Sequence, residues 1–213
     1  MCFNARVSIT TYLVGLAGCA ELYRQGRAAE AMFYAWVVHM QLIEFFLWRL
    51  QPQCSADPAW ALGQNALVSK AGLIINHLEP VVLWLAISYL PQGSRQLPGW
   101  MHAVMVGFVL ATAEYSRRVL SEQESLVTTV TPESAPHLHW KWNEGRGGGL
   151  YYAAFVAVLC ALAHYGLAYG RQNTVIIAAS FAASFAVYGK QHSVGAMWCF
   201  AASLAPWLLL ALA

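Results

Sequence analysis

The sequence predicts an all-α protein, a polytopic transmembrane helix bundle of about seven spans, and three observations carry this prediction. Of the 213 residues, 59% are hydrophobic and only 10% are charged, whereas charged residues make up about 25% of a soluble domain. Seven apolar stretches each come near the roughly 20 residues that a helix needs to cross a bilayer. Nine Trp and ten Tyr supply side chains that anchor helices at membrane interfaces. We therefore expect residues 1–213 to form a single membrane domain surrounded by the lipid bilayer.

Each apolar stretch is expected to be a helix, because unsatisfied backbone groups are not tolerated in lipid. The breaks between the stretches contain Gly or Pro, which are typical of turns and loops. The first and sixth stretches are short or weakly marked, so six spans plus a re-entrant segment is the alternative. The expected spans, in chain order, are residues 7–22, 29–50, 66–90, 98–119, 149–169, 172–189 and 193–212.

The long connection 120–148 is expected to lie outside the membrane. Loops of this length in a compact protein are usually functional or disordered. Trp140 and Trp142 favour a loop that packs down on the helices. His137 and His139 could form a surface metal pair, but a polar loop beside two Trp side chains that anchor at the interface is the favoured interpretation.

Alternating hairpins assign the polar residues to the two membrane sides. We call the side that holds the N-terminus side B and the opposite side A. Most ionisable residues inside the spans fall in the half nearer side B. Because a charge near the bilayer centre costs about 2.5–3.5 kcal/mol, these residues should face the bundle interior and find partners. This expectation applies to Glu44, Lys70, Glu79 and Glu114.

The compartment stays open on the sequence alone. An excess of Lys and Arg near side B favours a cytoplasmic side B. A disulfide between Cys2 and Cys54 would require the opposite, because disulfides persist in oxidising compartments. The net charge of +2 and the absence of a basic block in the sequence argue against a nucleic-acid partner.

The stretch Asn76-His77-Leu78-Glu79-Pro80 places an amide, an imidazole and a carboxylate near the middle of the third span. Asn76 and Glu79 are three residues apart and share a helix face. Pro80 removes the helical hydrogen bond to the carbonyl of residue 76 and predicts a kink. We expect this stretch to form the floor of a polar pocket that opens to side B beneath the long loop. The expected polar cluster is His39, Glu44, Lys70, Asn76, His77, Glu79, Glu114 and His192.

Zinc binding is the sharpest chemical hypothesis for this cluster. His39, His77 and His192 come from three spans, and three protein ligands plus a water are the pattern of catalytic zinc. Such a site would activate water for the hydrolysis of a lipid. The sequence contains no HExxH motif, and the alternative within the same hypothesis is that the cluster binds a small molecule or lipid.

Two non-enzymatic hypotheses compete with a ligand or metal site. In the first, the polar side chains only hold helices together, and the protein is a structural or accessory membrane subunit. In the second, the protein is a small transporter or channel. No inverted internal repeat is visible in the sequence, which counts mildly against a transporter.

Several motifs carry a resemblance to other proteins: MCFNARVS at 1–8, QLIEFFLW at 41–48, NHLEP at 76–80, HWKWN at 139–143 and GAMWCF at 195–200. With these motifs, most of the chain resembles an uncharacterised group of small multi-pass membrane proteins associated with large DNA viruses and unicellular eukaryotes. The resemblance implies a multi-span fold and no particular chemistry.

A comparison with the seven-helix membrane hydrolases that include the alkaline ceramidases fails at two positions. Ala35 stands where their second helix has Ser four residues before His, and Ala196 breaks the His-x-x-x-His pair of their last helix.

Overall fold

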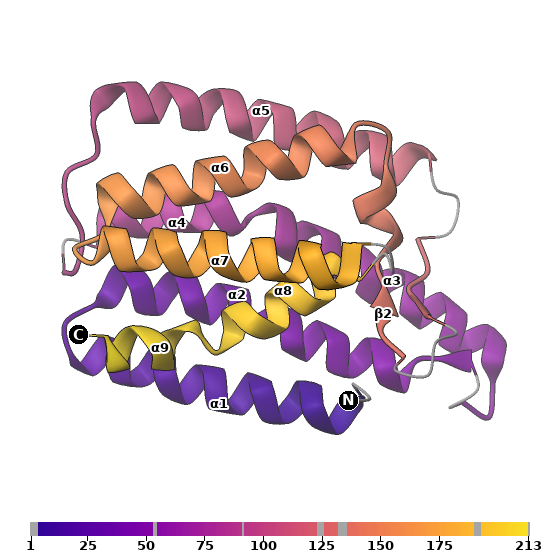
Figure 1. Ribbon diagram of the computed structural model, residues 1–213. Helices are drawn as coiled ribbons and strands as arrows, with labels where there is room; N and C mark the ends of the chain where they lie inside the picture. Colours follow the sequence, from indigo (N-terminus) through magenta and orange to yellow (C-terminus); the bar gives the residue numbers. More distant parts are fainter. Residues whose placement is uncertain are drawn as a thin grey trace.

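In the residues that it describes, the computed structural model of the protein has helices and one short hairpin as its regular elements, which confirms the predicted all-α class. It describes residues 4–52, 55–90, 92–122, 126–131, 136–189 and 193–212. The helices lie side by side and run back and forth between two ends (Figure 1). The N-terminus marks the end that we called side B, on the right in Figure 1, and the C-terminus lies at side A.

The elements follow one another with short connections except between α5 and α6. Their bounds are α1 (Ala5–Arg24), α2 (Ala28–Arg49), α3 (Pro58–His77), α4 (Glu79–Tyr89), α5 (Gly99–Glu122), β1 (Thr129–Val130), β2 (Leu138–His139), the 3-10 helix η2 (Lys141–Glu144), α6 (Gly148–Gly166), α7 (Gly170–Tyr188), α8 (Val194–Ser203) and α9 (Ala205–Ala211).

Local signals explain where several helices begin and end. The Asn4 side chain accepts hydrogen bonds from the backbone N–H groups of Arg6 and Val7, and Asp57 caps α3 in the same way, with Pro58 in the first turn. Such side chains satisfy backbone donors that have no partner within the helix. Gly26, at φ 75°, makes the tight turn between α1 and α2, because glycine adopts the left-handed region without strain.

Two helices, α2 and α6, are long and apolar enough to cross a membrane, and the number rises to four if each of two bent pairs is one span. The first pair is α3 and α4, which meet at Leu78 with a bend of 46°. This bend confirms the kink predicted beside Pro80. The second pair, α8 and α9, bends by 41° just before Pro206, where the sequence analysis expected one unbroken helix. The seven spans expected from the sequence are therefore not established by length and hydropathy.

Helix α2 lies at the centre of the bundle and packs against α1, α3, α4 and α8, while α5 lies at the edge and contacts α3, α4 and α6 (Figure 1). The core between them is apolar and includes Phe33, Met40, Leu83 and Phe155, all buried. Helix α3 begins eight residues before the expected start of its span, at Pro58 rather than residue 66.

The connection between α5 and α6 folds onto side B of the bundle. The Asn65 side chain in α3 donates to the carbonyl of Thr128 over 3.0 Å and accepts from its N–H over 2.9 Å. Trp140 and Trp142 stack with ring centroids 4.9 Å apart. Both are almost completely buried. The packing of this loop is confirmed, but the assignment of these two Trp as membrane-interface anchors was wrong, because they fill the bundle end beneath the loop.

Candidate functional site

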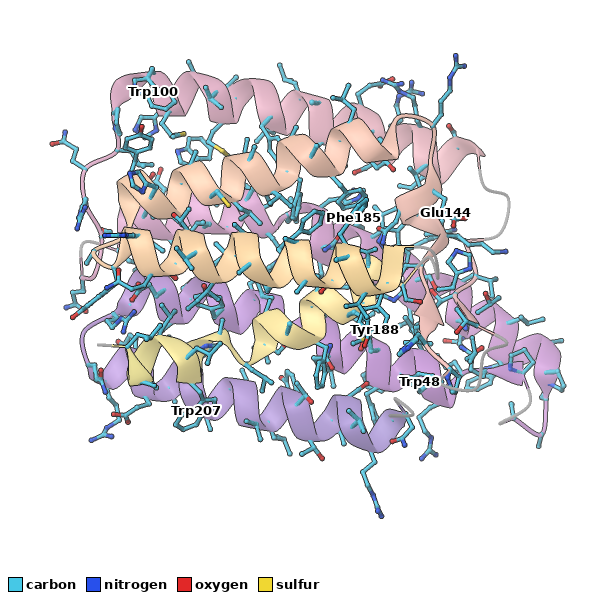
Figure 2. The ribbon with its side chains drawn as sticks, viewed as in Figure 1. Trp48, Trp100, Glu144, Phe185, Tyr188 and Trp207 are labelled. Carbon is cyan, nitrogen blue, oxygen red and sulfur yellow. The ribbon has the colours of Figure 1, made fainter. Side chains whose placement is uncertain are left out.

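A cavity of about 480 Å³ lies at the side B end of the bundle, between α6, α7 and α8 and below η2. Its walls are mainly apolar, with Phe181 and Phe185 from α7 and Trp198 from α8. Figure 2 shows Phe185 and Glu144 at this end of the molecule. The residues that line it are Asn76, Asn143, Glu144, Gly148, Gly149, Tyr152, Ala153, Phe181, Phe185, Gly189, Val194, Gly195 and Trp198.

Of the polar residues that line the cavity, Asn76 and Tyr152 lie deepest in the bundle. Both belong to a chain of hydrogen bonds. The Ser116 hydroxyl lies 2.7 Å from Nδ1 of His77, and Nε2 of His77 lies 3.0 Å from the Tyr152 hydroxyl. Tyr152 then donates to Oδ1 of Asn76 over 3.2 Å, and Asn76 donates to Oε1 of Glu79 over 3.2 Å. The chain joins α5, α3, α6 and α4 across the bundle.

The Glu79 carboxylate at the end of the chain fixes which group donates in each of these hydrogen bonds, because a carboxylate can only accept. Oε1 of Glu79 accepts the N–H of Asn76, so the other amide atom, Oδ1, faces Tyr152 and takes its hydrogen. With its hydrogen committed to Asn76, the Tyr152 oxygen accepts from Nε2–H of His77. His77 in its singly protonated form then accepts from Ser116 at Nδ1. The Tyr152 oxygen keeps one acceptor position, and Asn76 keeps one N–H.

His77 is also surrounded by aromatic rings. The ring centroids of Tyr115, Tyr151 and Tyr152 lie 5.4, 5.0 and 6.0 Å from its own. Tyr115 and Tyr151 stack at 4.2 Å. On its other side, His77 lines a separate cavity of about 170 Å³ between α3, α4 and α5. The imidazole is therefore fixed in position and is 1% exposed.

Glu79 lies one step further into the bundle. Its Oε2 is buried and has no hydrogen-bond partner among the described residues. Glu79 borders a void of about 10 Å³ that it shares with Tyr34 and Cys199. The accessible lining of this void is apolar, so the void does not offer the roughly two to four polar partners that a buried water needs. An unsatisfied buried carboxylate oxygen is costly.

The structure brings together Asn76, His77 and Glu79, as the sequence analysis expected, but it places four other predicted cluster residues elsewhere. Lys70 is exposed on the outer surface of α3. The Glu114 side chain is 44% exposed and forms ion pairs of 2.8 Å with Arg117 and Arg118. The expectation that both face the interior was wrong, because depth along a span does not set which face of the helix a residue occupies. His39 is half-buried against the ring of Tyr12.

Glu44 is buried, but it belongs to a different part of the bundle. Its Oε2 accepts from Gln41 over 3.0 Å, and it borders another void of about 10 Å³ with His137 and Met197. His137 packs against the ring of Tyr188, whereas His139 hydrogen-bonds to Glu144 over 2.9 Å. These two histidines therefore have separate surroundings and do not form the surface pair considered above.

The predicted zinc triad is not assembled by the described residues. His39 contacts α1, whereas His77 contacts α5 and α6. Within the part of the chain that the structure describes, no group of three or more His, Cys, Asp or Glu side chains could hold a metal ion. His192, Cys2 and Cys54 lie outside the described residues.

A second buried polar cluster lies at side A, and the sequence analysis did not identify it. Arg27 and Glu30 form an ion pair that is almost completely buried. Asn173 in α7 donates to Oε1 of Glu30 over 2.5 Å and accepts from the Tyr34 hydroxyl over 2.9 Å. The guanidinium carbon of Arg27 lies 4.1 Å from the ring centroid of Tyr169. The spacing of three between Arg27 and Glu30 was the available signal.

The chain was compared with protein-family models, with curated proteins and with solved structures, and none of them gave a match.

Proposed function

We propose that this chain is a multi-pass membrane protein that binds a small, mainly apolar molecule with one polar, uncharged end. Among the described residues, the bundle contains seven α-helical units if each bent pair is counted as one, and in the proposal all seven cross the membrane. Helices α1, α5 and α7 have 20, 24 and 19 residues. At about 1.5 Å per residue they are as long as the roughly 30 Å hydrocarbon core.

The outer surface of these helices supports a membrane position. Large apolar side chains point away from the bundle on each of them, which a soluble protein rarely shows over such an area. Leu13, Val106, Leu110, Val175 and Val187 are examples, all at least half exposed.

Exposed aromatic residues gather at the side A ends of the helices. Tyr23 ends α1, Tyr89 ends α4, Trp100 begins α5 and Tyr165 ends α6, and all four are exposed. Figure 2 shows Trp100 and Trp207 at this end of the molecule. Trp and Tyr concentrate where hydrocarbon meets head groups, so these residues support a bilayer boundary at side A.

The observation that carries the proposed ligand is the apolar cavity with Asn76 and Tyr152 as its innermost polar residues. Its volume of about 480 Å³ falls within the roughly 300–1,000 Å³ of small-molecule pockets. Asn76 keeps an N–H and Tyr152 keeps an acceptor position, and a ligand hydroxyl can use both. The described lining residues include Glu144 but no Lys or Arg. They therefore provide no positive charge that would bind an anionic ligand.

Zinc-dependent lipid hydrolysis is not part of this proposal, because the described residues do not assemble a ligand set. A purely structural role is the second candidate. The hydrogen-bond chain from Ser116 to Glu79 favours it, since this chain ties helices together whether or not the cavity is filled.

Quenching of Trp198 fluorescence tests the proposal, because this ring lines the cavity. The purified protein in nanodiscs is titrated with a brominated long-chain alcohol, and Trp198→Phe identifies the signal of this one ring. We expect saturable quenching that Ala153→Phe abolishes by filling the cavity. Ala154→Phe is the matched control, because Ala154 is the next exposed residue of α6 and is not a lining residue.

A brominated fatty acid of the same chain length tests whether the ligand's polar end must be uncharged. At a pH where the fatty acid is ionised, it should quench Trp198 more weakly than the alcohol does. Quenching that is equal in the Ala153→Phe and Ala154→Phe variants would show that the alcohol reaches Trp198 through the lipid and not through the cavity.

A further inference from the structure

The cavity of about 170 Å³ between α3, α4 and α5 contains a serine paired with a histidine. Ser116 and His77 both line this cavity, and the Ser116 hydroxyl oxygen lies 2.7 Å from Nδ1 of His77. A serine hydroxyl is a weak nucleophile until an adjacent base takes its proton. The pair therefore has the arrangement of an activated serine.

The hydrogen bonds around His77 present its basic nitrogen to Ser116. Nε2 carries the hydrogen, because the Tyr152 oxygen that it contacts at 3.0 Å has already committed its own hydrogen to Asn76. Nδ1 is then the nitrogen with an unprotonated lone pair, and Nδ1 is the atom that faces Ser116. Asn76 in turn is oriented by the Glu79 carboxylate. A nucleophile beside a base that a third group orients is the general signature of covalent catalysis.

The burial of the two partners suits these roles. His77 is 1% exposed and packs against the rings of Tyr115 and Tyr151. The imidazole therefore keeps its position while it takes up and returns a proton. Ser116 is only half-buried, so a substrate can reach its oxygen.

The cavity opens on the outer surface of the bundle, where α5 lies at the edge (Figure 1). Ile74 of α3 and Ala113 of α5 line it and are exposed. In the proposed membrane position this opening faces hydrocarbon, so a lipid can enter from the bilayer. Apart from His77, Thr112 and Ser116, the described lining residues are apolar and include Leu78, Val81 and Val109.

Ser116 lies near the side B end of α5, at the depth where the ester groups of membrane lipids are found. Arg117 and Arg118 follow it, are exposed, and form ion pairs with Glu114, which places them among the head groups. Val109 also lines the cavity and lies one to two turns nearer the bilayer centre, about 10 Å along the helix. The cavity therefore extends from the ester region toward the hydrocarbon, as an acyl chain does.

We propose that Ser116 and His77 form an acyl-transfer site that cleaves a carboxylic ester of a membrane lipid. The Ser116 oxygen attacks the carbonyl carbon while its proton passes to Nδ1 of His77. The C–O bond of the ester then breaks, the acyl group remains on Ser116, and His77 gives the proton to the departing alcohol oxygen. Water attacks the acyl-serine in the same way, with its proton passing through His77, and releases the fatty acid and the serine hydroxyl.

Thr112 supplies a donor for the negative charge that develops on the carbonyl oxygen. It lies one turn before Ser116 on α5 and lines the same cavity. The Thr112 hydroxyl contacts the Tyr151 hydroxyl at 3.2 Å. When Tyr151 donates in this contact, the Thr112 hydrogen is available to the oxyanion, which is the role of a preorganised donor in acyl transfer.

This site is separate from the larger cavity between α6, α7 and α8. It rests on the proposed membrane position and not on the ligand proposed for that cavity. The two proposals can therefore fail independently, and one set of purified variants in nanodiscs tests both.

Covalent labelling with a long-chain alkyl fluorophosphonate tests the nucleophile. In this reaction the serine oxygen bonds to phosphorus, fluoride leaves, and the base takes the hydroxyl proton. We expect one label per protein, located at Ser116 by mass spectrometry of peptides. Ser116→Ala should lose the label. Ser121→Ala is the matched control, because Ser121 is an exposed serine of the same helix that donates to the Arg118 carbonyl.

The base is tested with His77→Asn, whose amide oxygen can accept from Ser116 but cannot take up its proton. Labelling should become slower by about 10²–10⁴-fold, the usual contribution of a general base. Entry from the bilayer is tested with Ala113→Phe, which should lose most of the labelling by filling the cavity. Ala111→Phe is its control, because Ala111 is exposed on α5 and is not a lining residue.

Turnover is measured with a fluorogenic fatty-acid ester. We expect a burst of the fluorescent alcohol equal to the amount of protein, as acyl-enzyme formation requires, followed by slower release. Both phases should be absent from Ser116→Ala and unchanged in Ser121→Ala.

Two results would overturn the acyl-transfer site. One is the absence of label and burst from a native protein that still shows alcohol quenching of Trp198, which would leave the proposed ligand binding intact. The other is equally fast labelling in the native, His77→Asn and Ala113→Phe proteins, which would show an ordinary hydroxyl that needs neither the base nor the cavity. Labelling at Ser116 without saturable quenching would support this site and contradict the ligand proposed for the larger cavity.

Discussion

The Tyr152 hydroxyl donates to Oδ1 of Asn76 over 3.2 Å and thereby joins α6 to the end of α3 at the edge of the cavity. The same hydroxyl lies 3.0 Å from Nε2 of His77. One oxygen atom thus connects the buried imidazole with the amide that lines the cavity. If the proposed ligand binds in the cavity, stability and ligand binding should be coupled at this atom, and a single substitution tests this coupling.

Tyr152→Phe should destabilise the protein and weaken binding of the brominated alcohol. The change leaves an N–H of His77 and Oδ1 of Asn76 without this partner, at a cost of about 1–3 kcal/mol. Thermal unfolding in detergent measures the first effect and Trp198 quenching the second. Tyr151→Phe is the matched control, because the Tyr151 hydroxyl contacts Thr112 at 3.2 Å and is not part of the cavity. Equal loss of quenching in both variants would contradict the assigned role of Tyr152.

Glu79→Gln should be tolerated, unlike substitutions at most buried charged residues. The glutamine Oε1 can still accept from Asn76. Its N–H group replaces Oε2, which has no hydrogen-bond partner among the described residues. We expect thermal stability equal to or above that of the native protein, whereas Glu79→Leu should lower it by removing the partner of Asn76. A large loss in the glutamine variant would show that the carboxylate itself is required.

Lys70→Gln and Glu114→Gln distinguish the structure from the expectation drawn from the sequence. Both side chains are exposed. Each substitution should therefore change the free energy of unfolding by no more than about 0.5 kcal/mol and leave alcohol quenching intact. Removal of a partner from a buried cluster would cost several times more. Calorimetric or fluorescence melting curves of the purified variants measure the difference.

Asn65→Ala should release the loop that covers side B. The Asn65 amide makes two hydrogen bonds with the backbone of Thr128. Their loss, at about 0.5–1.5 kcal/mol each, leaves the Thr128 backbone held, among the described residues, only by the longer bonds to Ser69 Oγ at 3.2 Å and from Gln51 at 3.3 Å. The amide hydrogen of Thr128 should then exchange faster with deuterated water. Gln64→Ala, on the preceding residue of α3, should leave exchange in this segment unchanged. Global acceleration of exchange would indicate unfolding and not local release.

The sequence predicted those parts of the site that depend on local spacing. Asn76 and Glu79 share a face because they lie three residues apart in the same stretch, and Pro80 implied the kink beside them. Ser116 and Tyr152 approach His77 only through the packing of α5 and α6 on α3. No spacing along the chain encodes that contact, so it could not be predicted.

The errors have a common physical origin. In a chain that is hydrophobic on most faces, hydropathy gives the depth of a residue but only weakly indicates its direction. Lys70 and Glu114 were placed at the correct ends of their helices and on the wrong faces. Arg27 lies in the break between the first two expected spans, and nothing in that position along the chain indicates that its side chain turns inward to Glu30. Trp140 and Trp142 were read as interface residues because their residue type is common there.

The buried pair Arg27 and Glu30 should show strongly non-additive energetics. Glu30→Gln alone leaves the guanidinium buried beside a neutral amide, and Arg27→Met alone leaves the carboxylate buried with Asn173 as its remaining partner. Each single change should cost about 3–5 kcal/mol, because it uncovers the desolvation of the remaining charge. The double variant removes both charges and should recover most of that loss. A double-mutant cycle of melting temperatures measures the coupling, and additive effects would mean that the two charges of this buried cluster at side A do not depend on each other.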